Sequence, residues 1–251
     1  MVSVNIERSK HLDRVIPFLR ERKPDVVCLQ ELMDYDIPLF ERELGAKYWY
    51  AGNTHFPGEK GPGAMGVALF TALPVIADGI EYYWGTPGKL PNFDLTNTKT
   101  KHDSETRTVL YCDVKKANTV FRIATTHFTW TPDGEPDDIQ RGDLARMMPV
   151  LEKIGDFVVC GDFNAPRGGE IFEKIAAQYK DNIPERYVWS LDLQIHRGGL
   201  EHMTQEAANA GMPGLMVDGL FTTPAYVASD VELHNGVSDH CAITATISRH
   251  L

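Results

Sequence analysis

The sequence predicts an α/β protein in which two packed β-sheets carry helices on their outer faces. Residues 11–21 place apolar side chains at helical spacing, whereas residues 25–32 and 156–164 contain the continuous apolar runs typical of strands covered on both faces. Residues 106–116 and 119–128 form a predicted hairpin around a turn-tolerant asparagine. Helices mixed with buried strands and a hairpin favour two packed sheets over one parallel sheet.

The remaining elements are predicted from the same kinds of pattern. Helices are predicted at residues 38–44, 143–154 and 171–179, and strands at residues 66–75, 215–224, 227–233 and 241–249. Three segments lack clear periodicity, at about residues 52–64, 85–104 and 194–214, and long connections of this kind are often functional. No repeat and no linker rich in Pro, Gly or Ser divides the chain, so we expect a single domain over residues 1–251.

The composition indicates a globular protein with a sizeable core. The chain has 251 residues, of which 43% are hydrophobic and 24% are charged. No apolar stretch approaches the roughly 18 residues that a membrane span needs, and the first residues carry charge at once, so we expect neither a span nor a secretory signal. None of the four cysteines forms a CxxC pair. We therefore expect reduced, buried thiols and a cytoplasmic location.

The net charge weakens one class of function. The formal net charge is −10, and no basic cluster is longer than the Lys-Lys pair at residues 115–116. Proteins that grip long nucleic acids usually present a basic face to the phosphates. The acidic balance therefore disfavours a non-specific nuclease and is compatible with a site that concentrates divalent cations.

Polar side chains stand where the predicted strands end. Glu31 follows an apolar run and offers the oxygen ligand that magnesium prefers. His127 ends another run, where an imidazole can stabilise charge that develops on a substrate oxygen. Asp162 and Asn164 lie two positions apart, so on an extended chain their side chains point the same way. Each residue alone also fits a structural role, either as a solvated strand end or as a capping turn.

A last polar group precedes the final strand. Asp239 and His240 stand directly before an apolar segment, and histidine is the natural acid or base near neutral pH. Such a base usually needs a third group that fixes its tautomer, and Asp218 is the candidate. The alternative is a polar loop that leads into a strand.

Six short motifs in this order resemble those of the endonuclease/exonuclease/phosphatase superfamily of metal-dependent phosphohydrolases. They are VNIE (4–7), PDVVCLQE (24–31), ATTHF (124–128), GDFNAP (161–166), VDGLF (217–221) and SDH (238–240). This superfamily includes apurinic endonucleases, deoxyribonucleases, deadenylases, tyrosyl-DNA phosphodiesterases, sphingomyelinases and inositol polyphosphate 5-phosphatases. The resemblance implies a four-layer α/β/β/α sandwich of two mixed sheets, as in deoxyribonucleases, with the site at one rim.

The resemblance also implies roles for individual residues. It makes Glu31 the principal ligand of Mg²⁺ or Mn²⁺, with Asn5, Asp239 and the acidic Glu7 nearby. The catalytic residues that it implies are Asp162, Asn164, His127 and His240, with His240 held by Asp218. It places Asn5 near the phosphate as well, and Arg107 where several members carry a phosphate-facing arginine. Whether Asp162 or His240 is the general base stays open at this point.

These features together predict a divalent-metal-dependent phosphoester hydrolase, a phosphodiesterase or phosphatase that uses in-line attack of water. The alternative is a nuclease of the apurinic-endonuclease or tyrosyl-DNA phosphodiesterase type, and a remote alternative is a non-catalytic binding domain on the same scaffold. The expected partner is a phosphoester, either a small molecule or a nucleic acid end. The fold alone does not choose the substrate.

Two connections carry basic residues that we expect to contact substrate, although a solvated surface is an equal alternative. They are residues 85–107, with Lys89, Lys99, Lys101 and His102, and residues 195–214, with His196, Arg197 and His202. Trp130 directly follows the His127 strand and is placed either to stack on a substrate ring or to pack internally.

Overall fold

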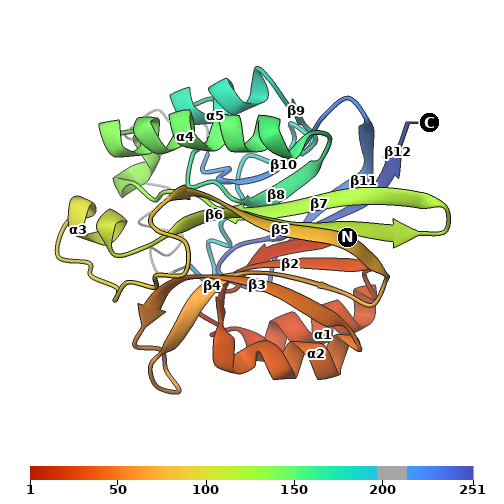
Figure 1. Cartoon of the computed structure of the whole chain (residues 1–251), viewed down its shortest axis with the longest axis horizontal. Helices are drawn as coiled ribbons and strands as arrows, with labels where there is room; N and C mark the ends of the chain where they lie inside the picture. The colour runs from red at the N-terminus through yellow and green to blue at the C-terminus, as the bar shows by residue number, and fades with distance from the viewer. Residues whose placement is uncertain (197–213, 251) are drawn as a thin grey trace.

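The computed structural model describes residues 1–196 and 214–250 (Figure 1). Two of the basic residues expected at the site, Arg197 and His202, lie outside this part of the chain. The described residues include no helix that is both long and apolar enough to cross a membrane. All four cysteines are buried and carry free thiols.

The strands form two mixed sheets of six strands each. The first sheet has the order β11 (Tyr226–His234), β12 (Ala242–Arg249), β1 (Val2–Asn5), β2 (Val26–Met33), β4 (Gly63–Thr71) and β3 (Lys47–Phe56). The second has the order β5 (Val75–Trp84), β6 (Arg107–Lys116), β7 (Thr119–His127), β8 (Val158–Asp162), β10 (Asp218–Thr222) and β9 (Lys180–Asp181). The pairs β1–β2 and β7–β8 are parallel, and the other paired strands run antiparallel.

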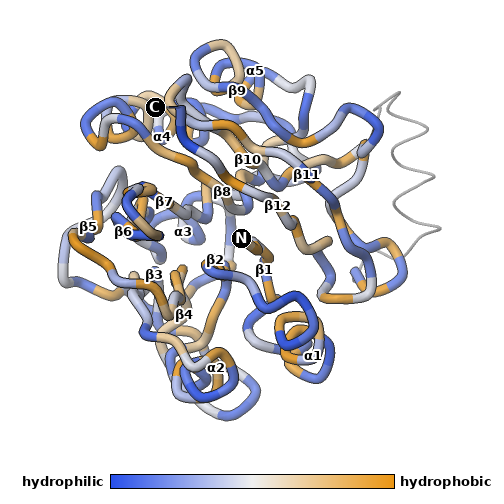
Figure 2. Tube along the Cα trace, turned by 90° about the vertical axis from the view of Figure 1, so that its right-hand side faces the viewer, coloured by the Kyte–Doolittle hydropathy of each residue, from blue (hydrophilic) through white to orange (hydrophobic). Residues whose placement is uncertain are grey.

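Helices cover the outer face of each sheet, which gives the predicted four layers. The helices α1 (Leu12–Arg22) and α2 (Ile37–Leu44) lie on the first sheet, and α4 (Asp138–Ile154) and α5 (Glu170–Ala176) lie on the second (Figure 1). Around α1 and α2 the residues alternate between hydrophobic and hydrophilic, as one-sided packing requires (Figure 2). The short helices α3 (Thr98–Asp103), η1 (Asp34–Asp36) and η2 (Pro132–Gly134) lie in connections.

The continuous apolar runs are explained by burial on both faces of the central strands. In β2, Val27 and Leu29 pack in the cluster beneath α1 and α2, whereas Val26 and Cys28 face the other sheet. The strand β8 does the same on the opposite side, where Cys160 faces inward. Because successive side chains of a strand point to opposite faces, a strand between two apolar layers carries no polar alternation.

Four of the described strands were not predicted: the short central strand β1 and three strands at sheet edges, β3, β5 and β9. β3 ends the first sheet and β5 ends the second. Only one long side of each strand is paired, and many of their residues are partly or fully exposed, so their sequences lack a clean pattern. The segments expected to lack regular structure accordingly contain the end of β3, the start of β4 and the short helix α3.

Strand direction brings the predicted polar residues to one rim. Asn5 pairs with Gln30 across parallel β1 and β2, and His127 pairs with Asp162 across parallel β7 and β8. Asp218 begins β10 opposite Asp162. Parallel neighbours end at the same edge of a sheet, so these side chains meet between the two sheets.

Gly161, directly before Asp162, occupies a position that no larger residue fits. Its φ is +149°, and an added Cβ would lie 2.0 Å from the carbonyl oxygen of Thr126. We expect Gly161→Ala to lower the free energy of unfolding by at least about 3 kcal/mol, because backbone of β7 must shift. Urea denaturation followed by circular dichroism measures the change.

The matched control is Gly168→Ala, where φ is +85° and no atom lies within 4 Å of the added Cβ. This control should cost about 1 kcal/mol through backbone conformation alone. Equal losses for the two variants would contradict the steric explanation.

Candidate active site

A β-bulge aims Glu31 into the space between the sheets. The register of β2 against β4 shifts between Leu29 and Leu32, and Glu31 has a φ of +57°. Bulges of this kind redirect a side chain at the end of a strand. The preceding residue, Gln30, stays fully buried and donates 2.9 Å to Thr125 Oγ1 in the opposite sheet. The strand therefore keeps its packing while its last acidic residue faces the rim.

The turn after β1 is conformationally strained. Glu7, Arg8 and Ser9 have consecutive positive φ values of 41°, 58° and 60°. Residues other than glycine adopt this region only where the surroundings impose it, and such strain clusters at functional sites. The amide N–H of Glu7 donates to Asn5 Oδ1 at 3.0 Å, and the amide N–H of Met33 donates to Ser9 Oγ at 3.0 Å. These bonds hold the turn against the bulged strand.

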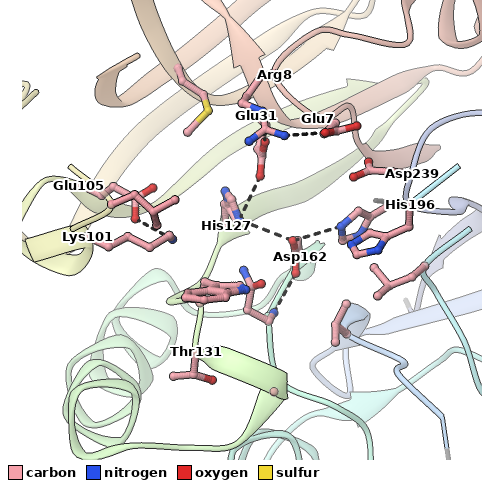
Figure 3. Close-up of a pocket in the computed structure, with 18 of the residues that line it drawn as sticks. Glu7, Arg8, Glu31, Lys101, Glu105, His127, Thr131, Asp162, His196 and Asp239 are labelled. Carbon is pink, nitrogen blue, oxygen red and sulfur yellow. Dashed lines mark hydrogen bonds and ion pairs between the residues drawn. The ribbon is translucent and has the colours of Figure 1, made fainter. Parts of the chain in front are cut away.

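Asp162 is the centre of the polar cluster and is only 2% exposed (Figure 3). Its Oδ2 accepts a hydrogen bond from Asn5 Nδ2 at 3.0 Å, and its Oδ1 accepts one from the amide N–H of Asn164 at 2.8 Å. The Nε2 atoms of His127 and His240 lie 3.5 and 3.8 Å from Asp162 Oδ2. Residues from both sheets thus converge on one carboxylate.

The electrostatics of the cluster disfavour bare carboxylates. Burial raises the pKa of Asp162 to about 7, although nearby His240 opposes the shift and Asp218 adds to it. Burial also raises the pKa of Glu31, and the negative charge of Asp239 contributes in the same direction. Carboxyl groups with such raised pKa values are typical of catalytic and ion-binding sites.

The two histidines differ in their charge. Burial alone lowers the pKa of His240, but Asp218 and Asp162 outweigh it and raise that pKa well above its ordinary value. The Nδ1 of His240 lies 2.7 Å from Asp218 Oδ2, which leaves Nε2 directed at Asp162. Burial and the positive charge of Arg107 hold the pKa of His127 well below its ordinary value. His240 is therefore a cation and His127 is neutral near pH 7.

The acidic residues at the rim fit a hard divalent cation. Glu31 and Asp239 supply carboxylate oxygens, the ligand type that Mg²⁺ and Mn²⁺ prefer. The negative charges of the two carboxylates repel each other, and a bound cation would offset this repulsion. Within residues 1–196 and 214–250, two groups of three side chains have ligand atoms within 4.8 Å of one another: Glu7 with His11 and Asp239, and Asp162 with Asp218 and His240. Asp239 and Asp162 thus each belong to a set of side chains close enough to share an ion, and Glu31 belongs to neither set.

Two of the predicted metal-site residues, Asn5 and Glu7, already have polar partners within the protein. Asn5 uses its amide oxygen for the Glu7 N–H and its amide nitrogen for Asp162 and Glu31, so it positions these carboxylates. Burial raises the pKa of Glu7, but hydrogen bonds from Lys10 and His11 outweigh it and hold that pKa at about 2. Glu7 is therefore already surrounded by cations.

Arg107 does not reach the cavity. Its side chain is 1% exposed, donates 3.1 Å to the carbonyl oxygen of His127 and pairs with Glu105. The predicted phosphate contact is therefore absent for this residue. Among the described residues, the arginine that lines the cavity is Arg8, which belongs to none of the six motifs, with its Nε 3.9 Å from Glu31. Arg8, Lys10 and His11, which follow Glu7 closely in the sequence, were the available signal.

The cluster opens into a cavity of about 530 Å³. Its apolar wall is formed by Phe56, Met65, Phe93, Leu95, Trp130, Leu191, Leu215 and Val217. Of the basic residues expected to contact substrate, Lys101 and His196 line the cavity. Lys99 instead forms an exposed pair with Asp103, and His102 is buried against Asp143 at 2.7 Å.

The family of the chain follows from comparison with known proteins. The model of the endonuclease/exonuclease/phosphatase family matches residues 2–240. The chain belongs to this family. The resemblance inferred from the six motifs is thereby confirmed. Comparison with curated protein sequences found no match.

Solved structures of family members have the same fold. The human Nocturnin catalytic domain is 17% identical with a TM-score of 0.68, over 99% of this chain and 92% of that one. The mannosyl-6-phosphatase Bt3783 from Bacteroides thetaiotaomicron is 11% identical with a TM-score of 0.65, over 99% of both chains. A humanized TDP2 from D. rerio is 17% identical with a TM-score of 0.64, over 98% and 97% of the chains.

The buried charge of Asp162 should cost stability in the absence of a divalent ion. Because its pKa is about 7 in the folded protein and lower in the unfolded chain, the cost is complete above pH 7 and disappears below pH 4. We expect Asp162→Asn to raise the free energy of unfolding by about 2 kcal/mol at pH 8 in EDTA, with no gain at pH 4. Urea titrations at the two pH values measure it.

The exposed Asp78 provides the control, since Asp78→Asn removes an equal charge that is not buried. This control should change the stability by less than about 0.5 kcal/mol at either pH. A loss of stability in Asp162→Asn at pH 8 would contradict the assignment of a destabilising buried charge.

Proposed function

We propose that this protein is a divalent-metal-dependent phosphoester hydrolase, a phosphodiesterase or phosphatase. The observation that carries the proposal is the convergence of Asn5, His127 and His240 on the buried carboxylate of Asp162, beside the acidic Glu31. In the reaction, the oxygen of a water molecule forms a bond to phosphorus while the opposite ester bond breaks. Phosphoryl transfer of this kind depends on positioning and on charge stabilisation.

Asp162 is the proposed base, and the charge states support this choice. A carboxylate with a pKa of about 7 is well matched to accept a proton from water near neutral pH. His240 already carries a proton at that pH, because the carboxylates of Asp218 and Asp162 outweigh its burial, so it acts as a donor to a phosphoryl oxygen. This division supports Asp162 over His240, the two candidates for the base that the sequence left open.

The remaining residues hold the substrate and the ion in this proposal. Glu31 and Asp239 would bind Mg²⁺ or Mn²⁺, which when bound neutralises phosphoryl charge. Neutral His127 donates from its ring to a phosphoryl oxygen. The side chain of Asn164 is fixed by its hydrogen bond to the carbonyl oxygen of Phe128 at 3.0 Å, which orients it beside the substrate. Asn5 keeps Asp162 and Glu31 in place.

The alternative functions and the cellular location expected from the sequence are also matters of proposal. A nuclease of the apurinic or tyrosyl-DNA type is the alternative, and the net charge of −10 gives it no support. The polar cluster argues against a purely non-catalytic binding domain. A cytoplasmic location is supported by the four buried free thiols.

Removing either central group should abolish most of the activity. We expect Asp162→Ala and His240→Gln each to lower kcat on bis-p-nitrophenyl phosphate by about a hundredfold or more, because one loses the base and the other the donor. Steady-state rates at saturating Mg²⁺ measure the effect, and EDTA should abolish the wild-type rate.

Lys99→Gln is the control, because Lys99 is exposed and its partner is Asp103. Its rate should stay within about twofold of the wild type. Nearly wild-type turnover in Asp162→Ala would refute the proposed mechanism, and a wild-type rate without any metal dependence would refute the metal requirement.

Asp218 should act on the pH profile rather than on substrate directly. Its charge supports the high pKa of His240, so Asp218→Asn should lower that pKa and move the alkaline limb of kcat toward lower pH by about one unit or more. Rates between pH 6 and pH 10 test this. An alkaline limb at the same pH in the variant would show that His240 does not govern it.

A further inference from the structure

A lysine stands on the wall of the cavity, away from the carboxylates of the polar cluster. Lys101 belongs to α3, and its ammonium lies 5.0 Å from the ring centroid of Trp130. Both residues line the cavity, and the Lys101 side chain is 15% exposed, whereas Trp130 is 38% exposed. Figure 3 places Lys101 beside Glu105, on the opposite side of His127 from Asp239.

Among the described residues, the charge of Lys101 is paired with a carboxylate that it shares with another cation. In the part of the chain that the structure describes, Glu105 is the only carboxylate within 4.0 Å of the Lys101 ammonium, at 3.3 Å. Glu105 is also the partner of the buried Arg107. One carboxylate thus pairs with two cations in a place with little solvent, and Glu31, which also acts on the Lys101 charge, lies beyond ion-pair distance. Incompletely paired buried charge is costly, so a cation of this kind at a cavity wall favours an anionic ligand.

The helix that carries Lys101 is held rigidly. Asn97 and Thr100 form a capping box at its start. The next residue, His102, is anchored twice. Its Nε2 lies 2.7 Å from the carboxylate of the buried Asp143, and the centroid of its ring lies 4.2 Å from the ring centroid of Trp84. Anchoring of this kind holds the lysine at the cavity without a substrate, which lowers the cost of binding.

Lys101 lies outside ion-pair distance of the carboxylates at the centre of the polar cluster. His127 lies within 4.0 Å of both Glu31 and Asp162, whereas Lys101 forms no such pair with either carboxylate in the described residues. A cavity of about 530 Å³ holds far more than one phosphate group. The cavity, which both the polar cluster and Lys101 line, therefore has room for a second substrate group.

We propose that Lys101, backed by the ring of Trp130, binds a second anionic group of the substrate, a phosphate or a carboxylate attached to the alcohol side of the scissile phosphoester. This inference rests on the proposed hydrolase function and narrows its substrate class. The ammonium would exchange part of its contact with Glu105 for a charge-assisted hydrogen bond to the ligand.

Isothermal titration calorimetry at a fixed free Mg²⁺ concentration tests the inference. The probes are ethyl phosphate, the bisphosphates of propane-1,3-diol and butane-1,4-diol, and the phosphate monoester of 4-hydroxybutanoate. We expect the wild type to bind at least one doubly anionic probe about tenfold or more tighter than ethyl phosphate. The carboxylate probe distinguishes a second phosphate from a second carboxylate.

Lys101→Gln should abolish this preference, and the matched variant Lys99→Gln, from the same helix, should keep it. Lys101→Met, which retains the aliphatic stem over Trp130, is the second variant if circular dichroism shows that Lys101→Gln does not fold. No preference in the wild type, or an unchanged preference after loss of the Lys101 charge, would overturn the inference.

Hydrolysis of bis-p-nitrophenyl phosphate by the same preparation separates the two proposals. Metal-dependent hydrolysis without a preference for doubly anionic probes overturns the Lys101 assignment alone. A preference in binding without any hydrolysis overturns the proposed reaction and leaves an anion subsite at Lys101.

Discussion

The hydrogen bond between Asn5 and Asp162 joins the two sheets at the rim on which the site is built. Asn5 ends β1 in the first sheet and Asp162 ends β8 in the second, and the 3.0 Å bond between them is buried. The apolar layer between the sheets is close-packed but not directional, whereas a buried polar pair must keep its geometry. Gln30 and Thr125 make a second bond of this type between the sheets. Together these bonds fix how the strand ends face each other.

Strained backbone conformations are also concentrated at this rim. Glu7, Arg8, Glu31 and Asn164 all adopt positive φ values, and all four line the cavity. Conformations of this kind cost about 1 kcal/mol or more each, so the packed sheets behind them must supply the stability. Strained backbone and buried carboxylates at the site both lower the free energy of unfolding. A bound cation would raise it again in part.

The sequence predicted the parts of the protein in which local pattern and tertiary environment agree. The apolar runs that end in Glu31 and Asp162 identified central strands, since only strands between two layers lack polar alternation. The edge strands β3 and β5 escaped prediction because their neighbours cover them on one side only. The burial of Arg107 depends on Glu105 and on a carbonyl of β7, and no local pattern reveals such partners. Strand ends were predictable, and the connections around them were not.

The residues that line the cavity belong to two kinds of segment, strand ends and connections. Asp162 and His127 end strands whose positions are fixed by both sheets, whereas Lys101, Trp130 and His196 stand on connections at the edge of the cavity. Substitutions in the connections can reshape the wall without disturbing the hydrogen bonds that hold the strand ends. During evolution the ligand can therefore change while the polar cluster at the strand ends stays the same. The residues on the connections and the residues at the strand ends are free to diverge at different rates.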